Sequence, residues 1–160
     1  MRCPGVIRKR ARRFTTSNDG TTFTDNPTSP GLALDFDATN AHLSPGATAY
    51  AAYAVQLSED SDYAADVALS GSTGTGEAAE DLTYTILKTE SFGCTAATTG
   101  TALVTDQPAT ATSGATMFSL DAVSTPAFLC VQVTAGEGLT QGSTGTIEWD
   151  LTGTSTDQLS

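Results

Sequence analysis

The sequence predicts an all-β protein, a single antiparallel β-sandwich of jelly-roll or immunoglobulin-like type with seven or eight strands. Short segments in which apolar and polar residues alternate recur along the 160 residues, and this alternation is typical of half-buried strands. Clusters of Gly, Pro, Asn and Ser separate these segments and indicate turns. No segment has a convincing helical period, so short strands at this spacing favour a sandwich. The length suits one domain with a real core.

The clearest strand is predicted over 48–57, behind the turn Ser44-Pro45-Gly46. Proline presets φ for such a turn, and glycine accepts the positive φ that a type II turn requires. A helix is the alternative because alanine is the best helix former, but two tyrosines and the Pro-Gly entry favour a strand. One face of this strand carries Ala49, Ala51, Tyr53, Val55 and Leu57, and the other carries Tyr50, Ala52, Ala54 and Gln56.

The same alternation predicts the remaining strands, in order, over 31–37, 63–70, 82–88, 102–105, 117–120, 128–133 and 144–152. Residues 71–79 and much of 91–113 are rich in Gly, Ser and Thr and are predicted as loops. In the last strand, Ile147, Trp149 and Leu151 alternate with two acidic residues. We therefore expect Trp149 to be buried.

Charge divides the chain into a basic head (1–13), a flexible lead-in (14–30) and the sandwich domain (31–160). Residues 14–160 carry one lysine, Lys88, against all 18 acidic residues, and so a formal net charge of −17. A body of this sign repels phosphate backbones, so no nucleic-acid partner is expected. The basic residues of the head are Arg2, Arg8, Lys9, Arg10, Arg12 and Arg13.

The head resembles the charged start of a signal peptide, but the apolar core of such a peptide does not follow it. It is therefore interpreted as a signal-peptide remnant or a misassigned start, with the mature protein beginning near Phe14. The alternative is a basic arm for nucleic acid or an anionic membrane. Since no run approaches the roughly 18 apolar residues of a membrane helix, no membrane insertion is expected.

Three cysteines are present, Cys3 in the head and Cys94 and Cys130 in the body. In an exported chain Cys94 and Cys130 are expected to form a disulfide that anchors the 91–113 loop. The alternative is a pair of buried free thiols in a reducing compartment. A metal site is disfavoured because the chain has one histidine and no close cysteine pair.

Catalytic motifs are missing from the sequence, which has no H-E-x-x-H, nucleophile elbow, phosphate-binding loop or dinucleotide fingerprint. We therefore expect no enzymatic activity, no metal and no cofactor. A triad built on the single histidine, His42, is the alternative, although no serine is marked out as its nucleophile. Calcium is a second alternative, because oxygen ligands occur in two acidic groups, Asp35, Asp37 and Asn40, and Glu59, Asp60 and Asp62.

The lead-in has two apolar anchors, Phe14 and Phe23, among many threonines. Two anchors are too few to hold the segment firmly on its own domain, yet threonine favours extended structure. We therefore expect it to be extended or disordered in the monomer. Phe14 and Phe23 mark it as a candidate donor strand that pairs with the open sheet edge of a neighbouring molecule.

The order of segments resembles the TasA/camelysin family of exported bacterial proteins, whose signal peptides are processed by a SipW-type peptidase. The resemblance rests on F-T-T-S-N-D-G-T-T-F-T-D, on L-A-L-D-F and on the turn L-S-P-G-A-T. The end of the chain, from L-C-V-Q-V-T to I-E-W-D-L-T-G-T-S, is similar to the actinobacterial branch. Together these segments cover about residues 14–158.

This resemblance implies a secreted, non-enzymatic structural protein of the cell surface or biofilm matrix. Members of the family polymerise into fibres by donating an N-terminal strand, so self-association and contacts with cell-wall or matrix components are expected. The alternative is a monomeric extracellular binding module for cell-wall glycan or another surface ligand. A metallopeptidase activity described for some members is not expected here, because the zinc-binding histidine pair is missing.

Overall fold

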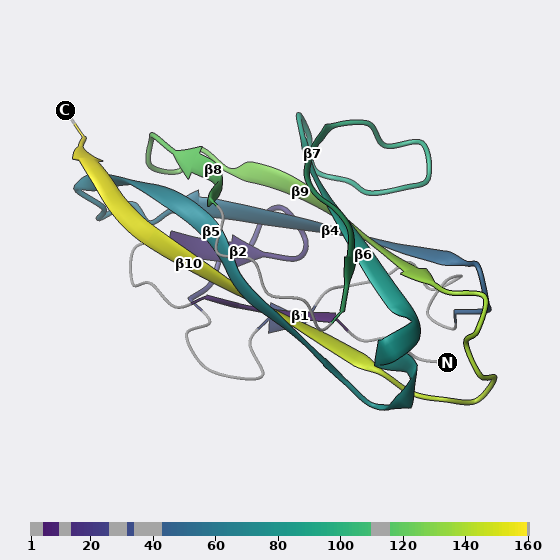
Figure 1. The fold of residues 1–160 in the computed structure, drawn as a ribbon. Helices are drawn as coiled ribbons and strands as arrows, with labels where there is room; N and C mark the ends of the chain where they lie inside the picture. The colour runs from purple at the N-terminus through teal and green to yellow at the C-terminus, as the bar shows by residue number, and fades with distance from the viewer. Residues whose placement is uncertain (1–4, 10–13, 26–31, 34–42, 110–115, 160) are drawn as a thin grey trace.

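The protein is a sandwich of two five-stranded β-sheets (Figure 1). The computed structural model describes residues 5–9, 14–25, 32–33, 43–109 and 116–159. Within these ranges the only helical element is a short 3₁₀ helix, Glu77–Asp81, and none is long and apolar enough to cross a bilayer. The predicted all-β sandwich is confirmed.

Each sheet is named here after its central strand. The β10 sheet contains, in spatial order, β3 (Leu32–Ala33), β1 (Gly5–Lys9), β10 (Thr146–Gln158), β5 (Tyr63–Thr75) and β8 (Thr116–Leu120). The β9 sheet contains β2 (Phe14–Ser17), β4 (Thr48–Leu57), β9 (Ala127–Ala135), β6 (Leu82–Thr89) and β7 (Thr101–Pro108). Neighbouring strands are antiparallel, except that β1 runs parallel to β10.

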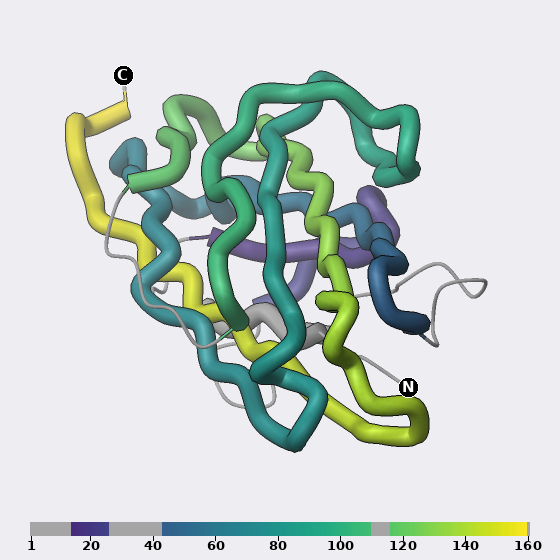
Figure 2. Tube along the Cα trace, turned by 45° about the vertical axis from the view of Figure 1, so that its right-hand side comes forward, coloured from purple at the N-terminus to yellow at the C-terminus, as the bar shows by residue number. Residues whose placement is uncertain are grey.

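The eight predicted strands have counterparts in β3 to β10, and β1 and β2 are additional. For the strand predicted over 31–37, only β3 lies within the described residues. The prediction of a loop from residue 71 was wrong, because β5 continues to Thr75 alongside β10 (Figure 2). Ser72 in this extension is buried and accepts a hydrogen bond of 3.2 Å from the hydroxyl of Tyr84.

The core fills the space between the sheets and has Trp149 near its centre. Trp149 is 0% exposed, which confirms its predicted burial, and Ile147 and Leu151 are buried beside it. The ring of Tyr84, from the other sheet, meets the indole edge-on at a centroid distance of 5.4 Å. Such pairs add roughly 0.5 to 1.5 kcal/mol beyond the burial of their area, so this contact ties the two sheets together.

Candidate assembly site

Strand β1 covers one edge of β10. The two strands pair in parallel from Gly5 beside Ile147 to Lys9 beside Leu151. On its other side, among the residues that the structure describes, β1 pairs with the two residues of β3. The sequence had suggested that the head lies outside the folded protein, whereas the structure gives five of its residues a place inside the β10 sheet.

The charges of the two strands are opposite. β1 contains Arg8 and Lys9, and the register places Arg8 beside Asp150. The stretch of β10 that β1 covers also contains Glu148. This match between the basic head and the acidic last strand is the signal in the sequence that would have identified β1.

Strand β2 belongs to the other sheet and is an edge strand there. It pairs antiparallel with β4, with Phe14 beside Leu57 and Ser17 beside Ala54. Phe14 is completely buried. The expectation that the lead-in is loosely held was therefore wrong for Phe14–Ser17, because β4 supplies main-chain partners and the core encloses the phenyl ring. Phe23 lies outside a strand and is half-buried.

The turn after β2 is fixed by hydrogen bonds around Asp19. The Asp19 carboxylate accepts bonds from the N–H groups of Thr22 at 2.7 Å and Thr21 at 2.8 Å, and from the Ser17 hydroxyl at 2.7 Å. These bonds, with Thr22 contributing most, hold the pKa of Asp19 well below its usual range. Gly20, at φ 77°, leaves room for the Phe92 ring, which a Cβ would approach to 2.7 Å. The turn therefore packs on the loop between β6 and β7.

The loop between β6 and β7 is held by the predicted disulfide. Cys94 and Cys130 are bonded, with their Cα atoms 5.0 Å apart, which confirms this pairing. Cys130 alternates with the core residues Leu129 and Val131 along β9 and so points to the outside of the sandwich, where the loop shields it. Phe92 of the loop meets Phe128 edge-on at a centroid distance of 6.3 Å.

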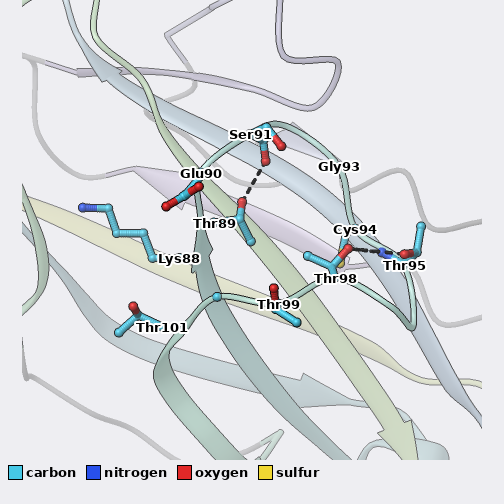
Figure 3. A pocket seen from close by; sticks show the side chains of 11 residues that line it. Lys88, Thr89, Glu90, Ser91, Gly93, Cys94, Thr95, Thr98, Thr99 and Thr101 are labelled. Atoms are coloured by element: carbon cyan, nitrogen blue, oxygen red, sulfur yellow. Dashed lines mark hydrogen bonds between the residues drawn. The ribbon is translucent and has the colours of Figure 1, made fainter.

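The same loop encloses a hollow of about 560 Å³ (Figure 3). Its lining is polar, and Lys88 and Glu90 are the charged residues. The Thr89 hydroxyl donates to the Ser91 carbonyl at 2.8 Å, and the Thr98 hydroxyl accepts from the Thr95 N–H at 2.8 Å. These hydroxyls form hydrogen bonds within the loop itself. We therefore interpret the hollow as the interior of a disulfide-anchored loop.

The described residues contain no group of three or more His, Cys, Asp or Glu side chains that could hold a metal ion. The side chains of Glu59, Asp60 and Asp62 are exposed in the turn before β5. Four predicted candidates, Asp35, Asp37, Asn40 and His42, lie outside the described residues, as does Cys3.

No protein-family model matches this sequence, and no curated protein matches it significantly. The resemblance to the TasA/camelysin family therefore stays a prediction.

Proposed function

We propose that this chain is a secreted, non-enzymatic structural protein of the cell surface or biofilm matrix, and that its copies assemble by exchanging their N-terminal strands. The observation that carries this proposal is the place of β1, parallel to β10 and next to the two-residue strand β3. Without β1, residues 147–151 of β10 form an open edge whose main-chain groups need a partner.

A second copy can supply that partner. Its residues 5–9 present the same main-chain groups in the same register, so exchange between molecules replaces every bond that it breaks. The chain separates β1 from β2 by four residues, and β2 lies in the other sheet. The exchanged segment therefore ends before Phe14, which belongs to the core of its own domain.

Opposite charges on one chain favour head-to-body contacts between copies. Six of the seven basic residues lie in residues 1–13, and all 18 acidic residues lie in the remainder. Two bodies of the same sign repel each other, whereas a basic head and an acidic body attract over roughly 10 Å at 0.1 M salt. Assembly is therefore expected to weaken as the salt concentration rises.

The disulfide supports export. Disulfides persist in oxidising compartments and are rare in the reducing cytosol, and Cys94–Cys130 joins two segments 36 residues apart. A location outside the cytoplasm, where cell-wall or matrix components are available as partners, agrees with this bond.

The test compares the full chain with a 14–160 variant that lacks β1 but keeps Phe14. Light scattering after gel filtration and negative-stain electron microscopy would report assembly, and circular dichroism would verify that both chains are folded. We expect oligomers or fibres from the full chain and monomers from 14–160. A synthetic peptide of residues 1–13, added in excess, is expected to occupy the β10 edge and reduce assembly of the full chain.

Two results would contradict strand exchange. One is assembly of the folded 14–160 variant into the same particles as the full chain. The other is a full chain that stays monomeric at every protein and salt concentration, which would favour the alternative of a monomeric binding module. Removing residues 1–30 is a poorer test, because it also removes Phe14 from the core.

A further inference from the structure

The outward face of the β9 sheet lacks ionised side chains along its three central strands, β4, β9 and β6. Six half-buried residues define it, and we call it the neutral face: Thr48, Tyr50, Thr83, Thr85, Gln132 and Thr134. The residues between them along each strand point into the core, such as Ala49, Val133 and Tyr84. In a chain with a formal net charge of −11, an uncharged sheet face needs a chemical explanation.

The strand register arranges the neutral face in two rows. Tyr50 lies beside Gln132, and Gln132 beside Thr85. In the next row Thr48 lies beside Thr134, with their hydroxyl oxygens 2.9 Å apart, and Thr134 beside Thr83. Neighbouring strands are about 4.8 Å apart. The face therefore presents hydroxyl, amide and phenol groups in two neighbouring rows.

Its chemistry selects against charged partners. The six residues of the face offer an ionic ligand no counter-charge. Asp106 on β7, whose N–H donates to the Thr85 hydroxyl at 3.1 Å, would repel an anion at the margin. Hydroxyl and amide groups both donate and accept hydrogen bonds, and the Tyr50 ring adds an apolar surface with a polar tip. A fitting partner is uncharged, carries many hydroxyls and has flat C–H surfaces.

We propose that the neutral face binds a neutral polysaccharide, with a sugar ring packed against Tyr50 and its hydroxyls bonded to Gln132 and Thr85. The Gln132 amide nitrogen lies 3.9 Å from the Cys130 sulfur, a weak contact that a sugar hydroxyl can replace. The proposal does not depend on strand exchange, because β1 lies in the opposite sheet of the sandwich. A monomer or an assembled chain presents the same face.

A second copy of the chain fits this face less well. Threonine side chains are short, so two such faces pressed together would not interdigitate. Their hydroxyls would lose water without gaining well-placed partners, and each polar group left unsatisfied would disfavour the contact. A polysaccharide carries its own hydrogen-bond donors and acceptors, which can pair with the side chains of both rows.

The experiment is affinity electrophoresis of the full chain in native gels that contain hydroxyethylcellulose, glucomannan, laminarin or dextran, with alginate as the charged comparison. The test variants are Tyr50→Ala and Gln132→Glu, and the second adds one charge to the face at almost unchanged volume. Each has a matched control away from the face: Tyr63→Ala removes a tyrosine that is 36% exposed, and Gln107→Glu adds the same charge at the edge strand β7. Circular dichroism and thermal unfolding verify the fold of each variant.

We expect retardation by at least one neutral polysaccharide and none by alginate. Each test variant is expected to weaken binding by at least about tenfold, as loss of a central contact does, while both controls bind like the original chain. The proposal is overturned if none of the neutral polysaccharides retards the chain, if folded test variants bind unchanged, or if alginate binds equally well. It is also overturned if Tyr50→Ala changes only the oligomeric state, which would assign the face to a second copy.

Discussion

The two outward faces of the sandwich follow the same alternation of side chains but differ in charge. On the β10 sheet the outward positions include Asp66, Glu148 and Asp150. On the β9 sheet the neutral face carries hydroxyls, an amide and a phenol in corresponding positions. Folding requires only that these outward positions be polar. Whether they are charged or neutral can therefore differ between the sheets according to what each face binds. The basic strand β1 joins the sheet with the acidic outward positions, whereas the neutral face lies on the opposite sheet.

The inward positions of both sheets, by contrast, are mostly apolar. Along one strand, an inward residue and its outward neighbour should therefore differ in how much their replacement lowers the free energy of unfolding. Trp149→Ala is expected to lower the free energy of unfolding by about 3 to 5 kcal/mol, because it leaves a large cavity where the two sheets meet. Urea unfolding followed by circular dichroism would measure this loss.

Glu148→Gln is the control on the same strand, one residue away and facing outward. It is expected to change the free energy of unfolding by only about 1 kcal/mol, since the side chain is half-buried, faces outward and leaves no cavity when its charge is removed. Equal losses from both substitutions would show that the alternation does not separate a core from an outer face.

The disulfide is a further difference between the two sheets, because it joins a loop to the outside of the β9 sheet only. Replacing both Cys94 and Cys130 by serine is expected to lower the free energy of unfolding by about 3 to 4 kcal/mol, since the bond closes a long loop in the unfolded chain. The same unfolding measurement under non-reducing conditions gives the value. The β10 sheet is expected to keep its structure, and unchanged stability of the double variant would contradict the role of the bond.

The smallest effect concerns two phenols on the inward face of the β9 sheet. Burial raises the pKa of Tyr53, and burial likewise raises the pKa of Tyr84 against the smaller effect of its hydrogen bond to Ser72. The folded protein therefore keeps both protons at a pH where the unfolded chain loses them. This contribution to stability is complete below about pH 10 and is lost as the pH rises further, by up to about 1.4 kcal/mol per unit for each tyrosine.

Unfolding curves between about pH 8 and 11 would test this, because the free phenol titrates near pH 10. Tyr53→Phe and Tyr84→Phe should each flatten the decline. A slope that stays the same as in the original chain in both variants would separate the alkaline instability from the buried phenols.

Alternation was sufficient to predict the fold and the central strands. Ile147, Trp149 and Leu151 identified β10, and Tyr53, Val55 and Leu57 identified β4, because large apolar residues occupied every second position. The end of β5 was missed, since Gly71 and Gly74 have no side chains to alternate. Their backbones pair with β10, and only the partner strand reveals that role.

The candidate site was harder to predict because it depends on contacts between distant parts of the chain. Arg8 and Lys9 suggested a tail, and their place beside the acidic strand β10 becomes visible only in the folded sheet. Phe14 was predicted to be a weak anchor, since a single aromatic residue in a polar segment shows no alternation of apolar and polar residues. Its burial depends on β4, whose edge it covers. The neutral face is likewise a property of three strands together.

The parallel pairing of β1 and β10 has a mechanical consequence. Because the two strands run in the same direction, the start of β1 and the far end of β10 point opposite ways along one axis. A pull applied at those two points therefore slides one strand along the other, and all the hydrogen bonds from Gly5 to Lys9 bear the load together. An antiparallel pair in the same place would open like a zip, one bond at a time. The fold thus places a shear clamp between its first and last strands.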